Sequence, residues 1–302
     1  MRDDLKNLKK MYKNGENILS HIKKSTGMEN NTSDAIAISY DLQAGSYIEF
    51  TKNNPEYENE RAKVYSEILN NLGEFKSIIE VGIGEGTTFS NIIPKLKQSD
   101  IVHGGFDISY SRVKYCQKYL NDNGIDGSFI FMADLFHSPI KSNSVDVVYT
   151  NHALEPNGMN EKNALKELYR ITKKYLVLFE PYFDSTDTAT KEHIHKHGYV
   201  RNLYSTAIEL GFNVVENREI FEKNPTSTNN TGLILIEKKC DGDAIITELD
   251  IQLACPVTGE PLKKVRGNYY SRECMLLYPV VDKVPCLLPD NAIIATHYLD
   301  DF

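Results

Sequence analysis

The sequence predicts an α/β protein, in which helices cover both faces of a seven-stranded sheet. Short apolar runs alternate with helical patterns from about residue 61 to residue 240, and this alternation is typical of a doubly wound parallel sheet. The first run ends in three glycines at alternate positions, and later runs end in acidic residues. Both features indicate a ligand site where the strands of a Rossmann-like sheet end. We therefore expect a helical cap at residues 1–60, the sheet domain at residues 61–240 and a small β-rich unit at residues 241–302.

Composition and charge describe an ordinary globular chain. Of its 302 residues, 41% are hydrophobic and 25% are charged, and the net charge is −8. This negative charge argues against nonspecific attraction to nucleic acid or to anionic lipid. No apolar run approaches the length of a membrane span, and the N-terminus lacks the apolar core of a signal peptide. The five cysteines have no paired spacing and fit a reducing compartment, so we expect a cytoplasmic protein.

Three helical patterns precede the first strand, at residues 5–24, 35–50 and 58–72. A break near Gly15 interrupts the first of them. We expect these helices to cap the ends of the strands, with Tyr40, Asp41, Gln43 and Tyr47 on the polar inner face of the cap. The alternative for the two tyrosines is a place in the core with only the hydroxyl in water.

The first predicted strand ends at a glycine turn, which is the most informative feature of the chain. Gly82, Gly84 and Gly86 allow positive φ and let a ligand lie against bare backbone. A dinucleotide fingerprint would need a glycine at position 87, which is Thr87. Instead an acid, Glu80, lies two residues before the first glycine. The spacing therefore argues against a nicotinamide dehydrogenase.

Acidic residues follow the next two strands of the predicted sheet. The predicted strands lie at residues 77–81, 101–106, 129–134, 144–152, 175–181, 213–215 and 232–237. Asp107 ends the second strand and Asp134 ends the third. A carboxylate at the tip of the second strand can accept both hydroxyls of a ribose. Either acid alone could be an exposed loop residue, but acids at the tips of consecutive strands indicate a nucleoside site.

This ordered set of motifs resembles the class I S-adenosylmethionine-dependent methyltransferases over roughly residues 70–240, most closely the small-molecule group that includes the ubiquinone-biosynthesis enzymes. The resemblance implies S-adenosyl-L-methionine as cofactor, with the glycine turn at its methionine end. Asp107 then binds the ribose, and Asp134 with the Leu135 amide binds the adenine. The implied cofactor-binding residues are Glu80, Gly82, Gly84, Gly86, Asp107, Asp134, Leu135 and Asn151. In this family an antiparallel last strand closes the sheet by a hairpin.

Methyl transfer is an in-line displacement, so orientation and exclusion of water supply most of the catalysis. An oxygen or nitrogen acceptor also needs a base, and His152 is the candidate, with Glu155 close behind. The alternative for His152 is a loop histidine that only shapes the pocket. The expected acceptor-binding residues are Tyr40, Tyr47, Glu180, Tyr182, His197 and Tyr199. For Glu180 and Tyr182, at the tip of the fifth strand, the alternative is that they have no chemical role.

A cluster of histidines raises the question of a metal site. His193 and His197 share one face of a helix, but His195 points elsewhere. A first shell needs three convergent ligands, so we interpret the segment as a solvated helix without metal.

Residues 253–289 resemble the small zinc-ribbon proteins that activate certain methyltransferases. A zinc ribbon needs two pairs of cysteines, each with two residues between them. In this chain the partner of Cys255 is Thr258, and the partner of Cys274 is Leu277. We therefore expect a metal-free unit that braces the fold or forms an oligomer contact, with recruitment of a partner as the alternative. Cys286 is an alternative third ligand, weighed against a buried apolar thiol.

The leading hypothesis is a methyltransferase that acts on an oxygen or nitrogen of a small polar metabolite, such as a sugar derivative. The fourth strand ends in Asn151-His152-Ala153, and not in the Asn-Pro-Pro-aromatic signature of enzymes that methylate amides, adenine or guanine. A second hypothesis is an enzyme acting on RNA or a translation factor, with the C-terminal unit as a built-in activator. A third is a cofactor-binding protein without catalysis.

Overall fold

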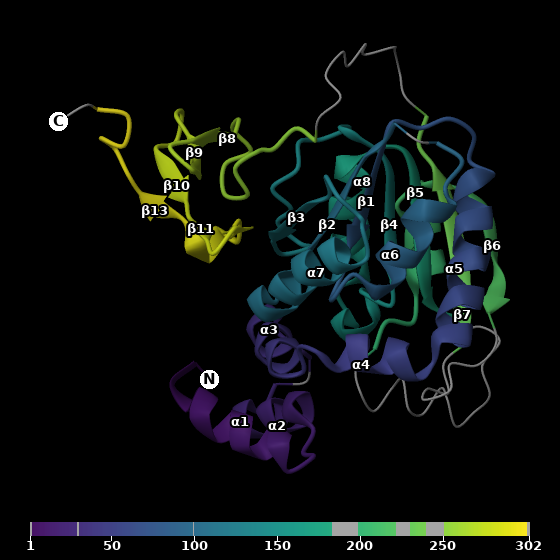
Figure 1. Ribbon diagram of the computed structural model, residues 1–302, viewed down its shortest axis with the longest axis horizontal. Coiled ribbons are helices and arrows are strands. Elements are labelled where there is room, and N and C mark those ends of the chain that lie inside the picture. The colour runs from purple at the N-terminus through teal and green to yellow at the C-terminus, as the bar shows by residue number, and fades with distance from the viewer. Residues whose placement is uncertain are drawn as a thin grey trace.

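The structure is a computed structural model that describes residues 2–28, 30–98, 100–182, 199–221, 230–239 and 251–300. An α/β body forms the centre of the molecule, with α1 and α2 below it and the C-terminal β unit at one side (Figure 1). The N-terminal helices, the α/β sheet and the small C-terminal β-rich region of the predicted fold class are all present. The helix at Pro55–Asn70 crosses the expected limit at residue 60, so the cap and the sheet domain share an element.

The central sheet has seven strands in the order β3-β2-β1-β4-β5-β7-β6. The strands are β1 (Ser77–Val81), β2 (Val102–Asp107), β3 (Phe129–Met132), β4 (Val145–Asn151), β5 (Thr172–Pro181), β6 (Asn213–Phe221) and β7 (Thr231–Glu237). The first five are parallel, and β7 runs antiparallel between β5 and β6. The doubly wound sheet and its antiparallel end are thereby confirmed. The carboxyl ends of β1, β2 and β4 meet at one edge, which is where ligands bind in such sheets.

Helices cover both faces of the sheet, because successive side chains of each strand point to opposite faces and both sets are largely apolar. The helices on the sheet are α5 (Pro55–Asn70), α6 (Thr87–Ile92), α7 (Tyr110–Asp122), α8 (Glu161–Ile171) and α10 (Leu203–Glu209), with single turns η2 (Ile93–Lys95) and η3 (Glu155–Asn157). On β5, Val177 and Phe179 pack with α5, α6 and α7, whereas Leu176 and Leu178 pack with α8 and α10. In the described residues, no helix has the length and hydropathy needed to cross a membrane.

Before α5 the chain forms four helices where the sequence predicts two, at residues 5–24 and 35–50. They are α1 (Leu5–Lys13), α2 (Ile18–Thr26), α3 (Ser33–Leu42) and α4 (Ser46–Asn53), after the short turn η1 (Arg2–Asp4). The predicted single helix over residues 35–50 is wrong, because α3 ends at Leu42 and Gly45, with a φ of 103°, is the N-cap of a separate helix, α4. The buried Glu85 carboxylate accepts hydrogen bonds from the N–H groups of Gly45 (2.9 Å) and Ile48 (2.8 Å). This acid caps α4 from inside the glycine turn, 40 residues away in the chain.

The C-terminal unit is a small β structure that docks on the edge of the central sheet. It has the strands β8 (Lys263–Val265), β9 (Asn268–Ser271), β10 (Leu276–Tyr278) and β13 (Ile293–Ile294), a hairpin of β11 (Val280–Val281) and β12 (Val284–Pro285), and the turn η4 (Pro289–Asn291). Leu287 N–H donates to the Met132 carbonyl (2.8 Å), and Cys286 pairs in parallel with Met132. The unit thus covers the exposed edge of β3, two residues before Asp134.

Candidate active site

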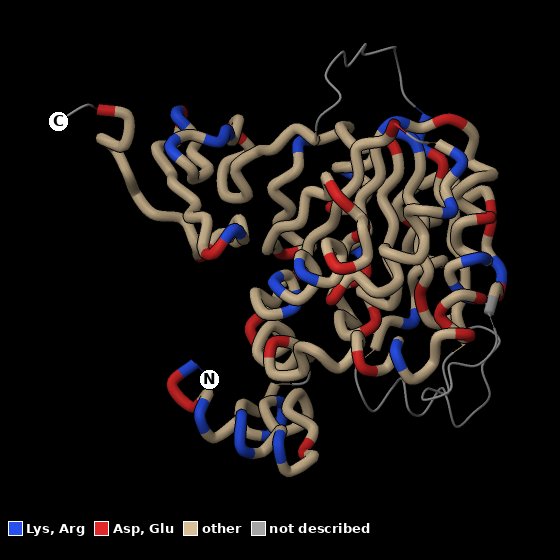
Figure 2. Tube along the Cα trace, viewed as in Figure 1, with Lys and Arg blue, Asp and Glu red and all other residues tan. Residues whose placement is uncertain are grey.

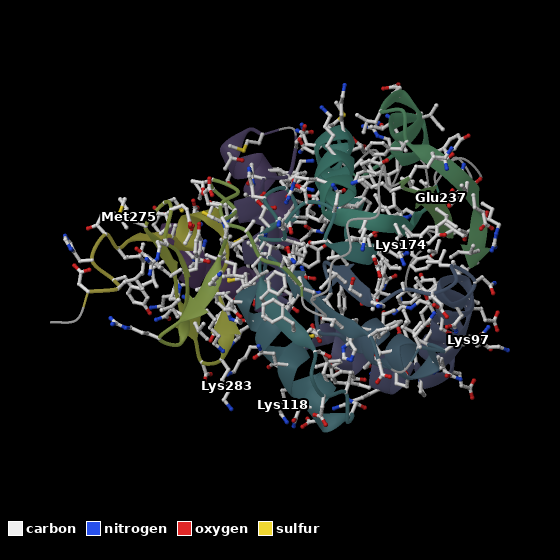
Figure 3. All side chains as sticks on the ribbon, turned by 90° about the horizontal axis from the view of Figure 1, so that it is seen from above. Lys97, Lys118, Lys174, Glu237, Met275 and Lys283 are labelled. Atoms are coloured by element: carbon white, nitrogen blue, oxygen red, sulfur yellow. The ribbon has the colours of Figure 1, made fainter. Side chains whose placement is uncertain are left out.

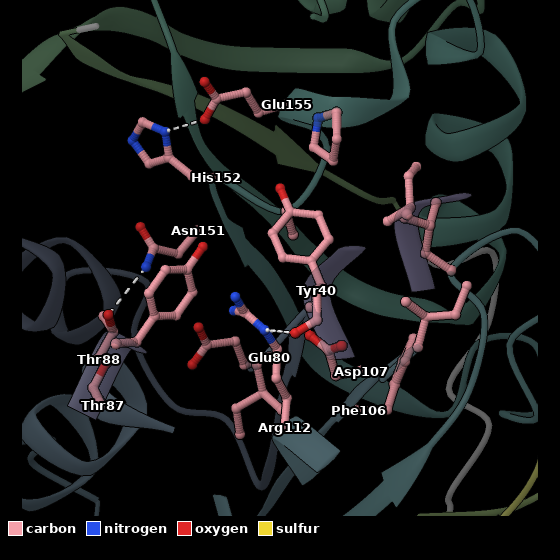
Figure 4. Close-up of a pocket in the computed structure, with 18 of the residues that line it drawn as sticks. Tyr40, Glu80, Thr87, Thr88, Phe106, Asp107, Arg112, Asn151, His152 and Glu155 are labelled. Carbon is pink, nitrogen blue, oxygen red and sulfur yellow. Dashed lines mark hydrogen bonds and ion pairs between the residues drawn. The ribbon is translucent and has the colours of Figure 1, made fainter. Parts of the chain in front are cut away.

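A cavity of about 430 Å³ opens at the carboxyl ends of β1, β2 and β4, beneath the helices α3 to α5. Its volume lies within the usual range of small-molecule sites. Figure 4 shows how strand ends and cap residues face one another across it. The predicted site residues that line it are Tyr40, Tyr47, Glu80, Gly82, Asp107, Asp134, Leu135, Asn151, His152 and Glu155. Residues from distant parts of the sequence thus meet in one place.

The glycine turn has the conformation that its sequence predicts. Gly82, Gly84 and Gly86 have φ values of 72°, 56° and 74°, which disfavour any side chain. A Cβ atom on Gly82 would lie 2.3 Å from the Cβ of Ala153, and one on Gly86 would lie 2.7 Å from the Cys116 Sγ. Gly82 lines the cavity with bare backbone, whereas the other two glycines shape the turn from behind.

Asp107 joins the end of β2 to this turn. Its Oδ2 atom accepts a hydrogen bond from the Gly84 N–H (3.0 Å), and its Oδ1 atom accepts one from the Ser109 N–H (2.9 Å). Burial raises the pKa of Asp107, and the nearby Arg112 guanidinium and these hydrogen bonds oppose that rise. The carboxylate therefore fixes the glycine turn and also faces the cavity.

Glu80 is a buried acid at the floor of the cavity. It is only 2% exposed, and its Oε2 atom accepts a hydrogen bond from the Tyr149 hydroxyl (2.7 Å). Burial raises the pKa of Glu80 to about 8, although the Tyr149 hydrogen bond and Arg61 act in the opposite direction. A proton on this carboxyl group is therefore stable near neutral pH.

This buried acid predicts a specific dependence of stability on pH. In the unfolded chain a glutamate ionises near pH 4.3, whereas in the folded chain Glu80 keeps its proton to about pH 8. The folded state then binds more protons between these values, so the free energy of unfolding should fall as pH rises, by at most about 1.4 kcal/mol per pH unit for one group. Glu80→Gln should lose that part of the slope in urea unfolding measured from pH 5 to 8.

Glu180 serves as the internal reference in this experiment. Burial raises its pKa to about 7, so its contribution has the same sign and should persist in Glu80→Gln. Equal slopes in the wild type and Glu80→Gln would contradict the assigned pKa of Glu80.

Arg112 is a cation of the cavity wall that no sequence motif predicted. It is 1% exposed, and its guanidinium lies 4.7 Å from the ring centre of Tyr40 and 4.0 Å from that of Tyr47. Its Nε–H donates to the Tyr40 carbonyl (3.0 Å), but its buried Nη2 has no hydrogen-bond partner among the described residues. A buried donor of this kind can bind an oxygen of a ligand in the cavity. The only sequence signal is the position of Arg112 in the first turns of the helix that follows Asp107.

The N-terminal cap is tied to the sheet by two carboxylates in opposite directions. Glu85 caps α4 from the glycine turn, as described above. In return, Asp41 accepts hydrogen bonds from the N–H and hydroxyl of Ser111 and from the hydroxyl of Ser109, all within 2.9 Å, at the start of α7. Asp41 was expected on the inner face of the cap, and it lies there as a helix cap. The cap is therefore hydrogen-bonded both to the glycine turn and to the start of α7.

Asn151 belongs to a polar network at the end of β4. Its side-chain NH₂ donates to the Thr88 hydroxyl (3.0 Å), and its oxygen accepts from the Tyr65 hydroxyl (3.2 Å). Arg61 donates to the same Thr88 hydroxyl and to Glu58, both at 2.6 Å. Arg61, Thr88 and Glu58 line the cavity as well, although no motif in the sequence singled them out.

Asp134 and Leu135 lie at the end of the cavity next to the C-terminal unit. Asp134 is 9% exposed, and its Oδ1 atom accepts a hydrogen bond from the Phe136 N–H (2.9 Å). The Ser33 hydroxyl lies 3.4 Å from its Oδ2 atom. The turn after β3 is therefore ordered by this carboxylate, and it presents Leu135 to the cavity.

His152 is the residue after β4 and has a φ of 52°, a value that is uncommon outside glycine. Its Nδ1 lies 3.1 Å from Glu155 Oε2, and its Nε2 lies 2.8 Å from the Thr231 hydroxyl. A carboxylate at Nδ1 favours a proton on that nitrogen, which leaves Nε2 as a hydrogen-bond acceptor. The pair can therefore take a proton at Nε2.

Residues 79–178 match a family model described as a methyltransferase domain, and this range begins in β1 and ends in β5. The chain therefore contains a class I S-adenosylmethionine-dependent methyltransferase domain. The solved structure of a geranyl diphosphate methyltransferase in complex with SAM is 10% identical, has a TM-score of 0.50, and covers 60% of this chain and 85% of its own. Magnesium protoporphyrin IX methyltransferase from Synechocystis PCC 6803, with bound SAH, is 15% identical and has a TM-score of 0.46. The match covers 60% of this chain and 83% of that chain. At these identities the likeness is one of fold.

A second kind of relative is much shorter. The UPF0434 protein msl4429 of Mesorhizobium japonicum is 46% identical over 57 residues, which are 18% of this chain and 67% of that protein. The methyltransferase therefore contains a segment that belongs to the family of this small protein.

Three predicted acceptor residues of the methyltransferase lie outside the cavity wall. Glu180 is 2% exposed, and its Oε1 atom accepts hydrogen bonds from the N–H groups of Ala153 (3.0 Å) and Leu154 (3.1 Å). It therefore holds the turn that carries His152. Tyr182 packs against Gly232, where a Cβ atom would lie 2.5 Å from its ring.

Tyr199 is the third of these residues, and burial together with the Glu155 carboxylate raises its pKa. His197 lies outside the described residues, as do His193 and His195.

The cavity fits the cofactor of this class, S-adenosyl-L-methionine. A glycine that admits no side chain lines it, and so does Asp107, the acid at the end of β2. Arg112 adds a buried donor without a partner in the described part of the chain. Apolar groups supply the surface that an adenine ring needs; they include Ile83, Phe106, Ile108, Leu135 and Phe136.

Proposed function

We propose that this methyltransferase transfers a methyl group to an oxygen or nitrogen of a small polar metabolite, such as a sugar derivative. The observation that carries this proposal is the His152–Glu155 pair, which lines a cavity of about 430 Å³ beneath a helical cap. A cavity of this size suits a cofactor and a small acceptor. The described lining of the cavity contains two arginines, Arg61 and Arg112, and both contact the protein itself.

We assign the cofactor contacts to the residues named from the sequence and add two. Glu80 and the Gly82–Gly86 turn hold the methionine end, Asp107 binds the ribose, and Asp134 with Leu135 faces the adenine. Asn151 orders the end of β4 through Thr88 and Tyr65. Arg61 and Arg112 are the added residues, because each lines the cavity and carries a buried nitrogen without a partner in the described chain.

When bound, the cofactor supplies an electrophilic methyl group on a sulfonium. The protein must then orient the acceptor, exclude water and remove one proton. We assign proton removal to His152 Nε2. It takes the proton of the acceptor hydroxyl or amine, and its hydrogen bond with the Thr231 hydroxyl is broken. Glu155 stabilises the resulting imidazolium through Nδ1. Glu180 is a positioning residue, because it holds the two amides that follow His152.

A screen with radiolabelled S-adenosylmethionine tests this proposal. Small hydroxylated and aminated metabolites, bulk RNA and a protein extract are offered in parallel, and the label is followed into each fraction. We expect incorporation into the small-molecule fraction, lost in His152→Ala. Label that enters only RNA or only protein would contradict the proposed acceptor class.

One observation favours the second hypothesis, an RNA substrate. The α1–α2 pair carries a local excess of lysines on a negative chain, as Figure 2 shows. They are Lys6, Lys9, Lys10, Lys13, Lys23 and Lys24. Binding to phosphates would weaken steeply with salt, so a salt titration of RNA affinity, with these lysines replaced by glutamine, decides whether this surface binds RNA.

We further propose that the C-terminal unit braces the adenine side of the site. The 57-residue match to the UPF0434 protein is close to the length of this unit, and it supports an autonomous module. The hydrogen bond from Leu287 to Met132 supports a brace two residues before Asp134. In the described residues, no group of three or more histidines, cysteines or acids is arranged to hold a metal. The unit is therefore proposed to fold through its apolar strands.

The lost ligand positions allow a gain-of-function test. The double substitution Thr258→Cys and Leu277→Cys would complete two cysteine pairs with the ribbon spacing, and we expect it to bind about one zinc per chain. The wild type and each single variant should carry none, because fewer than four ligands make no closed site. Elemental analysis measures this. Zinc in the wild-type protein, lost together with folding on chelation, would show that the metal-free assignment is wrong.

A further inference from the structure

Two cysteines of the C-terminal unit lie in contact. The Cys274 Sγ is 3.7 Å from the Cys255 Sγ, and both thiols are free. Cys255 lies in the turn before Gly259, and Cys274 lies in the turn between β9 and β10. A disulfide bond is about 2.05 Å long, so the two sulfurs need to approach by only about 1.7 Å. The pair bridges two turns that are 19 positions apart in the chain.

The surroundings favour reaction of these thiols over inert burial. The Cys255 Sγ lies 3.2 Å from the Tyr278 hydroxyl. Hydrogen bonds from Thr258, Tyr278 and the amides of Val257 and Thr258 outweigh burial and lower the pKa of Cys255. A lower pKa means more of the nucleophilic thiolate.

Cys274 provides access to the pair. Cys255 is only 2% exposed, whereas Cys274 is half-buried and its neighbour Met275 is 42% exposed. Figure 3 shows Met275 at the outer end of the C-terminal unit, at the far side of the molecule from Glu237 and Lys97. A small disulfide in solution can therefore reach Cys274 first, and Cys255 lies behind it.

We propose that Cys255 and Cys274 form a reversible thiol–disulfide site that exchanges with small disulfides of the glutathione type. The Cys274 sulfur attacks one sulfur of the glutathione disulfide, which forms a mixed disulfide and releases the first glutathione thiolate. The Cys255 thiolate then attacks the Cys274 sulfur and releases the second glutathione. In total the two protein thiols lose two electrons and two protons, and one glutathione disulfide becomes two glutathiones.

A zinc ribbon would need four cysteines in this unit. Thr258 and Leu277 stand where the second pair of thiolates would be, so two sulfurs are left facing each other. The bridge would close the loop that contains β8 and β9, next to the hairpin β11–β12 that lies against β3. A closed loop restricts the unfolded state, so the oxidised unit should unfold at a higher temperature.

Exchange is tested on the full chain with glutathione redox buffers. We expect the thiols titrated in denaturant to fall from five to three as the buffer becomes oxidising. The intact mass should fall by about 2 Da, and peptide mapping should join Cys255 to Cys274. Excess dithiothreitol should restore all five thiols.

Single variants separate this site from general oxidation. Cys255→Ser should stop at the mixed disulfide, with about 305 Da added at Cys274. Cys286→Ser is the matched control, since its sulfur lies against the Val284 carbonyl, and it should still form the bridge. Five thiols that persist in oxidising buffer, a bridge between other cysteines, or a zinc ion that protects both sulfurs would each overturn the proposal.

Discussion

Replacement of His152 with alanine is expected to lower the turnover number by about 10²–10⁴-fold, the range that a general base contributes. The imidazole is held between Glu155 and Thr231, and its Nε2 is the acceptor that can receive the proton of the substrate. Single-turnover kinetics with labelled cofactor measure the loss. The affinity for the cofactor, measured by calorimetry, should change little, because His152 is assigned to the acceptor side.

Two further variants distinguish a base from a pocket-shaping residue. Glu155→Gln keeps the shape of the pair but removes the charge that stabilises the imidazolium, so its turnover should fall less than that of His152→Ala. Added imidazole should restore part of the activity of His152→Ala, because only the proton acceptor is missing. A His152→Ala enzyme that keeps most of its turnover at neutral pH would leave orientation as the sole source of catalysis.

Asp107→Ala is expected to weaken S-adenosylmethionine binding by about 1.5–3 kcal/mol, or roughly 10–150-fold in Kd, because charge-assisted hydrogen bonds to the ribose are lost. The carboxylate also accepts hydrogen bonds from Gly84 and Ser109, so the glycine turn loosens with it. Isothermal calorimetry measures the affinity of the wild type and the variant under the same conditions.

Asp146 supplies a matched control for this experiment. It is also a buried acid that accepts a backbone hydrogen bond, from Lys76 at 2.7 Å, but it lies at the opposite end of the sheet, near the start of β4. Asp146→Asn should therefore bind the cofactor as the wild type does. Wild-type affinity in a folded Asp107→Ala protein would remove the ribose assignment.

The architecture could be predicted because its signals are local. The strands β1, β3, β4, β5 and β7 are largely apolar runs, and the positive φ values of the glycine turn leave few alternatives to glycine at Gly82. The break at Gly45 was missed because its cause is remote: Glu85 caps α4 across 40 residues of sequence. A helical pattern alone does not show where a distant carboxylate will cap the start of a new helix.

Glu180 illustrates the limit for site residues. Like Asp107, it is an acid near the end of a parallel strand, and the sequence pattern treats the two alike. In the structure Asp107 lines the cavity, whereas Glu180 holds the amides of Ala153 and Leu154. Arg112 was missed for a related reason, since only the packing of α3 and α4 on α7 brings two tyrosine rings to its guanidinium.

The most direct measurement of the central claim is calorimetric titration of the purified chain with S-adenosylhomocysteine and, separately, with NAD. The cavity at the ends of β1, β2 and β4 predicts about one S-adenosylhomocysteine per chain, weakened strongly by Asp107→Ala and unchanged by Asp146→Asn. NAD should give no heat, because Thr87 stands where a dinucleotide turn needs glycine. Binding of NAD without binding of S-adenosylhomocysteine would contradict the account.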